Sequence, residues 1–212
     1  MATGQLPIAA DRGARPTYGP GTALLVVDVQ NDFADPKGSL YVNGGERIIG
    51  RITEHIRAAE AAGSAVVYTQ DWHPPVTAHF AKDGGIWPVH CVHGTWGAQF
   101  HPELLVLPDA PVVRKGTGGE DGYSAFSVRD PLSGDVRRTQ LGELLRERGI
   151  ERVVIAGLAT DYCVKESGLD AVRLGFHPTV LADAVRAVDL QPGDGERALE
   201  ALEAAGAELV QG

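Results

Sequence analysis

Short apolar runs and amphipathic stretches alternate along most of this chain. Six runs rich in Val, Ile and Leu are mostly apolar throughout, which is typical of parallel strands that are covered on both faces. Stretches with helical spacing lie between them. In residues 46–62, for example, Ile48, Ile52 and Ile56 recur every four residues, and Gly63 ends the pattern. The predicted strands are residues 23–27, 65–69, 111–113, 152–156, 178–181 and 208–210.

The succession of strand, helix and glycine predicts the fold class. It recurs four times, which is the pattern of βαβ units. We therefore expect an α/β fold with a doubly wound, mainly parallel six-stranded sheet and helices on both faces. Residues 22–212 are expected to form one domain, and residues 1–21, rich in Pro, Gly and Ala, a loosely ordered N-terminal arm. The predicted helices are residues 46–62, 139–148, 161–174 and 192–205.

Composition narrows the classes of function. Of the 212 residues 43% are apolar, enough for a sizeable core, while the net charge of -9 argues against nucleic acid as a partner. No apolar run approaches the length of a membrane span, and the arm lacks the apolar region of a signal peptide. Cys91 and Cys163 are too few for a disulfide scaffold. We expect a cytoplasmic protein with a small-molecule partner, and the sequence leaves homo-oligomerisation open.

Residues 71–109 break the alternation of strands and helices. They hold all three tryptophans and five of the seven histidines, and a loop of this length is usually functional or disordered. In open α/β sheets, ligands bind outside the carboxyl ends of the strands. Asp28, Asp71, Lys115 and residues 159–163 all follow predicted strands. We therefore expect their side chains to converge at one edge of the sheet.

The histidine-rich segment contains candidate metal ligands. One carboxylate and three imidazoles suit Zn²⁺, Fe²⁺ or Mn²⁺, with water completing the coordination shell. Asp71 and His73 are two residues apart, so an extended chain places both side chains on one side. The alternative is a set of unrelated loop histidines. The candidate ligands are Asp71, His73, His79 and His90, with His93 and His101 as competitors that spacing does not exclude.

Cys163 is a candidate nucleophile. The segment that contains it reads as a strand, a tight turn and a helix start, which Thr160 or Asp161 can cap. In the first helical turn, the helix dipole and unpaired N–H groups favour a thiolate and can hold an oxyanion. The alternative is a buried structural cysteine.

Asp28 and Lys115 are candidates for the other charged groups of an active site. Asp28 ends an apolar strand, so partial desolvation raises the pKa of its carboxyl and suits it to act as a base. Lys115 follows another strand and would keep that carboxylate ionised. The alternatives are a turn or capping aspartate and a solvated surface lysine.

Five segments, taken in order, resemble the nicotinamidases of the isochorismatase-like cysteine hydrolase superfamily. The resemblance covers residues 22 to 210, and the segments together are very specific. Tyr162 stands where some members carry a histidine. The segments are residues 26–33 (VVDVQNDF), 71–73 (DWH), 87–95 (WPVHCVHGT), 115–116 (KG) and 157–163 (GLATDYC).

The resemblance implies a role for each matching residue. It selects His90 over His93 as a metal ligand and implies a cis peptide bond between Leu158 and Ala159. The implied residues are Asp28, Lys115 and Cys163 as the catalytic triad; the N–H groups of Ala159 and Cys163 as the oxyanion hole; Asp71, His73, His79 and His90 as ligands of one divalent ion; and Phe33, Trp87, Tyr123, Leu158 and Ala159 as the substrate pocket.

The implied activity is metal-dependent hydrolysis of nicotinamide to nicotinate and ammonia through a thioester on Cys163. Pyrazinamide is an expected further substrate, and the reaction would belong to NAD salvage. One alternative is another amidase of the superfamily that acts on a carbamoyl or ureido compound; such members generally lack the metal ligands. A second alternative is a non-catalytic protein that binds metal or nicotinamide, against which the complete triad speaks.

Overall fold

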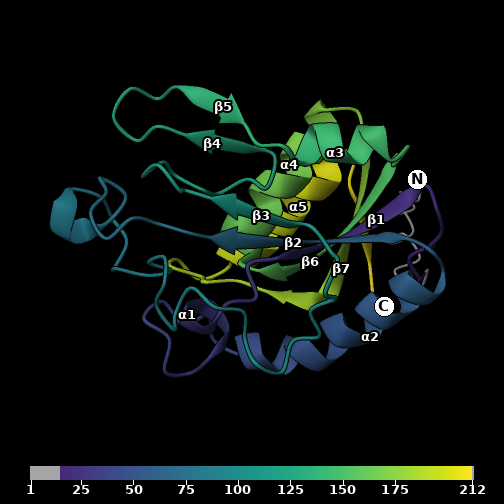
Figure 1. Ribbon diagram of the computed structural model, residues 1–212, viewed down its shortest axis with the longest axis horizontal. Helices are drawn as coiled ribbons and strands as arrows, with labels where there is room; N and C mark the ends of the chain where they lie inside the picture. Colours follow the sequence, from purple (N-terminus) through teal and green to yellow (C-terminus); the bar gives the residue numbers. More distant parts are fainter. Residues whose placement is uncertain (1–14, 212) are drawn as a thin grey trace, which may run out of the picture.

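The computed structural model describes residues 15–211, and its centre is one parallel sheet (Figure 1). The strands lie in the order β3-β2-β1-β6-β7-β8, and every neighbouring pair in this sheet is parallel. The predicted six-stranded doubly wound sheet is therefore confirmed. Its strands are β1 (Thr22–Val27), β2 (Ala65–Asp71), β3 (Val112–Lys115), β6 (Arg152–Leu158), β7 (His177–Arg186) and β8 (Glu208–Val210).

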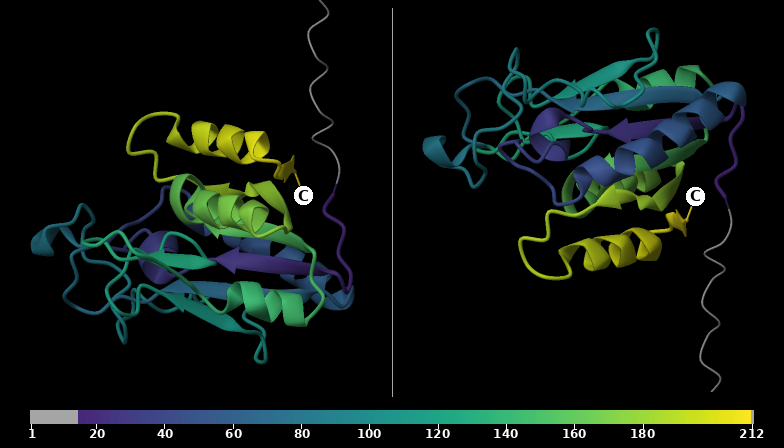
Figure 2. Two further views of the ribbon diagram at one scale, coloured as in Figure 1. Left: turned by 90° about the horizontal axis from the view of Figure 1, so that it is seen from above. Right: turned by 90° about the horizontal axis from the view of Figure 1, so that it is seen from below.

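Helices cover both faces of the sheet (Figure 2). Alternate residues of a strand point to opposite faces, so Leu24 and Val26 of β1 pack on the side of α2, whereas Ala23 and Leu25 pack on the other side. Both faces are thus apolar, which explains why β1 is buried along its whole length. The helices are α2 (Ile49–Ala61) on one face and α3 (Leu141–Glu147), α4 (Lys165–Arg173) and α5 (Asp194–Ala204) on the other.

The carboxyl ends of the central strands meet at one edge of the sheet. Asp71 at the end of β2 lies in register with Lys115 at the end of β3, and Val27 of β1 lies in register with Gly157 of β6. Gly157 has a φ of 123°, and a Cβ there would overlap the carbonyl oxygen of Val27. Only glycine fits this close approach, which holds the ends of β1 and β6 together.

Several short elements were not predicted. The hairpin of β4 (Ser127–Arg129) and β5 (Val136–Arg138) escaped notice because its strands are short and β5 is exposed, so no apolar run marks them. The predicted helix 161–174 begins as a π-helical turn, Thr160–Val164, and the predicted helix 46–62 begins as a 3-10 turn, Gly45–Ile48. The remaining short elements are α1 (Asn31–Ala34) and a 3-10 turn (Ala81–Asp83).

The predicted N-terminal arm lies outside the described residues as far as residue 14. Within residues 15–21, the Tyr18 hydroxyl lies 2.9 Å from Nδ1 of His55 on α2, and the Gly19 N–H donates to Ser64 Oγ at 2.8 Å. This part of the arm is therefore fastened beside α2. Among the helices within residues 15–211, none combines the length and apolarity needed to cross a bilayer.

Candidate active site and metal centre

Asp28, Lys115 and Cys163 come together at the carboxyl edge of the sheet. Nζ of Lys115 lies 2.6 Å from Asp28 Oδ2 and 3.5 Å from Cys163 Sγ, and it also donates to the carbonyl oxygen of Gly122. Thr69 Oγ1 donates to the other carboxylate oxygen of Asp28 at 2.6 Å. Asp28 and Lys115 are fully buried, and Cys163 is 6% exposed. The lysine is therefore no surface residue, and its ammonium group connects a carboxylate to a thiol.

Burial and charge set the protonation of these groups. Burial raises the pKa of the Asp28 carboxyl, and the adjacent Lys115 ammonium opposes the rise. Burial also disfavours the charged form of Lys115, but the carboxylates of Asp28 and Asp71 outweigh it and raise the pKa of this lysine well above its usual value. Lys115 is thus a permanent cation, and Asp28 has the raised pKa that was predicted.

Cys163 is the third titratable residue of this cluster. Burial raises the pKa of its thiol well above the ordinary value, with Lys115 opposing and Asp28 reinforcing the rise. The thiol therefore keeps its proton at rest and needs a base before the sulfur can act as a nucleophile. Reactive atoms of Asp28 and Cys163 lie within 4.8 Å of one another, so the thiol has a carboxylate base nearby.

Asp161 does not cap the turn that holds Cys163. The turn begins after Ala159 without a side-chain cap. The Asp161 carboxylate instead accepts the N–H groups of Val188 and Asp189, both at 2.9 Å. It therefore fastens the loop after β7 to the nucleophile turn, a long-range contact that local sequence does not encode. The peptide bond between Leu158 and Ala159 is cis, as the resemblance implied.

Three imidazoles converge beside this group. His73, His79 and His90 each bring a ring nitrogen within 4.8 Å of the others, and all three are buried. Asp71 Oδ2 lies 3.6 Å from Nε2 of His73 and 3.8 Å from Nε2 of His90. The structure therefore brings together all four predicted ligands.

The donor set fits a divalent metal ion. Nδ1 of His90 lies 2.7 Å from the carbonyl oxygen of Pro88, and Nδ1 of His79 lies 2.6 Å from Asp121 Oδ1, so each ring keeps Nε2 for another partner. Both nitrogens of His73 are buried and have no hydrogen-bond partner within the protein. An unsatisfied buried nitrogen is costly, and a metal ion in the middle of the cluster would satisfy one of the two.

A second cluster of acidic and thiol groups does not suit a metal. Asp28, Asp71 and Cys163 also lie within 4.8 Å of one another. Lys115 Nζ already lies among them, at 2.6 Å from Asp28 and 3.1 Å from Asp71. This place already holds a cation, so the histidine cluster is the candidate metal centre.

The competing histidines lie elsewhere. His93 is exposed to solvent, and Nε2 of His101 lies 3.8 Å from Asp35 Oδ2 while its Nδ1 accepts the N–H of Glu103. Neither belongs to the cluster of three imidazoles. The choice of His90, which spacing left open, agrees with the geometry.

One cavity joins the thiol to the histidines. Its apolar walls include three of the predicted pocket residues, Phe33, Trp87 and Tyr123, as well as Tyr162. Trp87 Nε1 donates to the Tyr123 hydroxyl at 2.7 Å, and the Trp87 ring meets the Tyr162 ring edge-on with centroids 4.8 Å apart. The other lining residues are Leu40, Val42, Asp71, His79, His90, Ala159, Cys163 and Val188.

Leu158 was also predicted for the pocket, but it is not among the lining residues. Its side chain is fully buried in the core on the α2 side and approaches Gly45, where an added Cβ would lie 3.2 Å from its Cδ1. Leu158 therefore lies in the core, whereas the following residue, Ala159, lines the cavity.

The isochorismatase domain profile matches residues 22–212 of this sequence. The chain belongs to the isochorismatase family. Nicotinamidase from Escherichia coli is 38% identical over 206 residues, covering 90% of this chain and 94% of the relative.

Solved structures of the isochorismatase family resemble this one closely. A pyrazinamidase of Pyrococcus horikoshii in complex with zinc has a TM-score of 0.81 and 41% identity, over 91% of this chain and all of the relative (100%). PnC1 from L. infantum in complex with nicotinate has a TM-score of 0.82 and 35% identity, over 92% of this chain and 96% of the relative. The zinc complex agrees with the metal fit argued from the unsatisfied imidazole of His73.

Some residues that position the site of this family member were missed by sequence reasoning. The Gln30 side chain clamps the backbone of Asp71, donating from Nε2 to its carbonyl at 2.7 Å and accepting its N–H at 2.8 Å. Gln30 lies in residues 26–33, one of the segments that carry the family resemblance, so the sequence did draw attention to this region. Asp121 touches His79 from a glycine-rich loop that carried no signal for such a contact.

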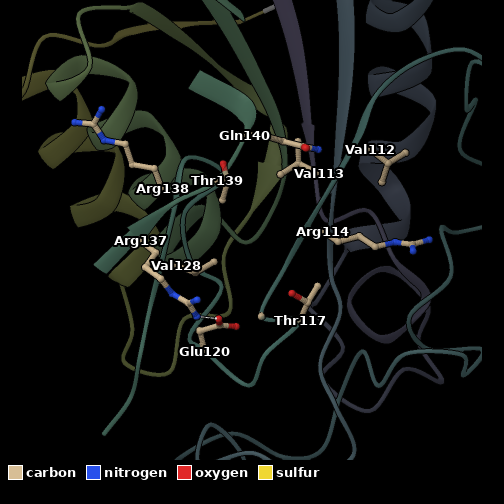
Figure 3. Close-up of a pocket in the computed structure, with 11 residues that line it drawn as sticks. Val112, Val113, Arg114, Thr117, Glu120, Val128, Arg137, Arg138, Thr139 and Gln140 are labelled. Carbon is tan, nitrogen blue, oxygen red and sulfur yellow. Dashed lines mark hydrogen bonds and ion pairs between the residues drawn. The ribbon is translucent and has the colours of Figure 1, made fainter. Parts of the chain in front are cut away.

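A larger cavity of about 510 Å³ lies between β3 and the β4–β5 hairpin, apart from the triad (Figure 3). Its charged groups do not converge. Arg137 pairs with Glu120, the Arg114 guanidinium lies 3.9 Å from the Trp72 ring, and Arg138 points away. This larger cavity therefore lacks the group of reactive side chains that lines the smaller cavity beside Cys163.

Proposed function

We propose that this chain is a metal-dependent nicotinamidase, which hydrolyses nicotinamide to nicotinate and ammonia and also acts on pyrazinamide. The observation that carries the proposal is the cavity that is lined by the thiol of Cys163 and by two of the three clustered imidazoles, His79 and His90. Behind the thiol, Lys115 and Asp28 lie buried and in contact with one another. Relatives named nicotinamidase and pyrazinamidase support it. A cavity lined by aromatic side chains together with a thiol suits a flat aromatic amide.

The first step in this proposal is activation of the thiol. Asp28 accepts the proton of Cys163, and the sulfur attacks the carboxamide carbon of the substrate. The raised pKa of Asp28 makes this carboxylate a better base than a solvated one. Lys115 stays protonated between the two groups, so negative charge passing from carboxylate to sulfur remains beside a fixed cation.

The second step is loss of ammonia. The backbone N–H groups of Ala159 and Cys163 hold the oxyanion of the tetrahedral intermediate. Asp28, now protonated, gives its proton to the departing nitrogen, and a thioester of Cys163 remains. Asp28 then accepts a proton from water as the water attacks the thioester carbon. The C–S bond breaks and Asp28 returns this proton to the departing sulfur, which restores the thiol and the carboxylate; the nicotinic acid released ionises to nicotinate.

The aromatic ring of the substrate is held by the apolar walls of the cavity. Phe33 and Trp87 line its sides, and burial of an aromatic ring against them excludes water from the reacting carbon. A divalent ion held by Asp71, His73, His79 and His90 would act as a Lewis acid toward the pyridine nitrogen and so orient the ring.

The test is ammonia release from nicotinamide by native, metal-stripped and metal-restored protein. We expect activity that is lost on stripping and regained on restoration. Cys163→Ala should abolish turnover, whereas Cys91→Ala, which alters the other buried free cysteine, should retain it. Turnover by Cys163→Ala would refute the thioester. No ammonia from folded, metal-loaded protein would refute the substrate and point to another amide, such as a carbamoyl compound.

We further propose that the enzyme works in the cytoplasm. A thiol nucleophile must stay reduced, and a reducing compartment keeps it so. Cys91 and Cys163 are both free and buried, which agrees with this setting.

A further inference from the structure

The three imidazoles of the candidate metal centre are supported in different ways. His90 is held by a carbonyl of its own loop, Pro88, only two residues away. His73 has no hydrogen-bond partner on either nitrogen, and Gly116 presses on its ring, where an added Cβ would lie 2.6 Å from Nδ1. His79 alone is hydrogen-bonded to a carboxylate, that of Asp121, at 2.6 Å and 42 residues away in sequence.

The hydrogen bond to Asp121 has a defined effect on His79. A carboxylate accepts only, so Nδ1 must carry the proton and Nε2 keeps its lone pair. The Asp121 carboxylate also brings a second negative charge to the site. Together with Asp71 it would balance the two positive charges of a divalent ion. Such outer carboxylates orient a metal-binding imidazole and raise its basicity.

Asp121 is itself firmly placed. Its backbone N–H donates to the carbonyl of Arg129 at 2.7 Å, and its own carbonyl accepts the N–H of Arg129 at 3.1 Å. The β4–β5 hairpin therefore holds the backbone on which the carboxylate stands. The next residue, Gly122, accepts from Lys115 and packs so tightly that a Cβ there would lie 2.7 Å from Asp71 Oδ1. One short loop thus touches the lysine and two of the candidate ligands.

We propose that Asp121 is a positioning residue for the metal centre, which fixes the tautomer of His79 and, through its backbone pairing with Arg129, makes the β4–β5 hairpin part of the support of that centre. The inference rests on the metal site of the proposed function. It assigns the hairpin and Asp121 a role in holding the ion.

The experiment measures the affinity of metal-stripped full-length protein for Zn²⁺, by competition with a chromogenic chelator. Asp121→Ala should weaken zinc binding by about 10- to 100-fold, and Asp121→Asn, which keeps size but not charge, by about tenfold. The matched control is Glu120→Gln, which alters the neighbouring acid of the same loop. Glu120 contacts Gly118 and Arg137 rather than a histidine, so this variant should bind zinc as the parent does.

A second readout separates positioning from folding. The thermal midpoint of the metal-stripped Asp121→Asn protein should match that of the parent, while the rise in midpoint on adding Zn²⁺ should be smaller. Folded Asp121→Asn that binds zinc within twofold of the parent overturns the inference. An equal loss in Glu120→Gln also overturns it, because loop integrity would then be the cause.

The outcome does not depend on the substrate. Zinc affinity is measured without nicotinamide, so a parent that releases no ammonia while Asp121→Asn still loses affinity refutes the proposed reaction and leaves this inference standing. Ammonia release by an Asp121→Asn protein with unchanged zinc affinity refutes this inference and leaves the proposed reaction standing.

Discussion

Replacing Lys115 with methionine tests whether the buried ammonium stabilises the protein. Nζ of Lys115 lies 2.6 Å from Asp28 Oδ2 and 3.1 Å from Asp71 Oδ1, and both aspartates are at most 5% exposed. Methionine fills similar space but leaves two carboxylates without their shared cation. Breaking a buried ion pair by removing one partner costs about 3–5 kcal/mol, because the remaining charge is uncompensated. We expect a loss of that size in the free energy of unfolding.

The assay is denaturant unfolding of metal-stripped protein, with Arg173→Met as the control. Arg173 pairs with Asp170 at 3.0 Å on the surface, where its side chain is 65% exposed, so its loss should cost less than about 1 kcal/mol. Adding Asp28→Asn to Lys115→Met should recover part of the loss, since one uncompensated charge disappears. A loss from Lys115→Met no larger than that of the surface control would refute the reasoning.

Three further predictions concern the same site and its frame. Asp28 must be ionised to accept the thiol proton, and burial raises the pKa of its carboxyl. On acidification kcat/KM should therefore begin to fall at a pH above the ordinary aspartate pKa of about 3.9. A fall that occurs only at or below this pH would contradict the prediction. Gly157→Ala should lower the free energy of unfolding by more than about 2 kcal/mol, because Gly157 has a φ of 123° and the new Cβ would overlap the Val27 carbonyl oxygen. Gly175 has a φ of 84° but no neighbouring atoms in the way, so Gly175→Ala should cost only about 1 kcal/mol. Equal losses of the two variants in chemical denaturation would count against the close approach. Tyr123→Phe removes the hydroxyl that accepts the Trp87 N–H. In steady-state kinetics it should raise KM for nicotinamide about fivefold at unchanged kcat, which is equivalent to about 1 kcal/mol. An unaltered KM would refute a role of this hydrogen bond in shaping the pocket.

The sequence alone determined the sheet and the edge at which the site lies. Fully apolar runs such as residues 23–27 are typical of strands covered on both faces, so a mainly parallel sheet was predicted from the alternation of strands and helices. The order of the strands came only from the structure. The rule that ligands bind at the carboxyl ends of such strands then brought Asp28 and Lys115 to one place. Resemblance to a family supplied the roles and the choice of His90 over His93.

Only the tertiary structure decided the electrostatics and the support of the site. Desolvation of Cys163, which raises the pKa of its thiol, depends on what packs around the side chain and so follows only from the tertiary structure. Leu158 lies in the core and its neighbour, Ala159, lines the cavity, a difference that the family resemblance did not distinguish.

The contacts that hold the site were beyond sequence reasoning for a common reason. The pairing of Asp121 with His79 joins residues 42 apart, and that of Asp161 with Val188 joins residues 27 apart. No local period or motif encodes such a meeting, because it depends on how two loops pack after the sheet has formed. The spacing of hydrophobic residues determines the strands and helices, whereas the packing of distant loops determines which partner each polar group finds.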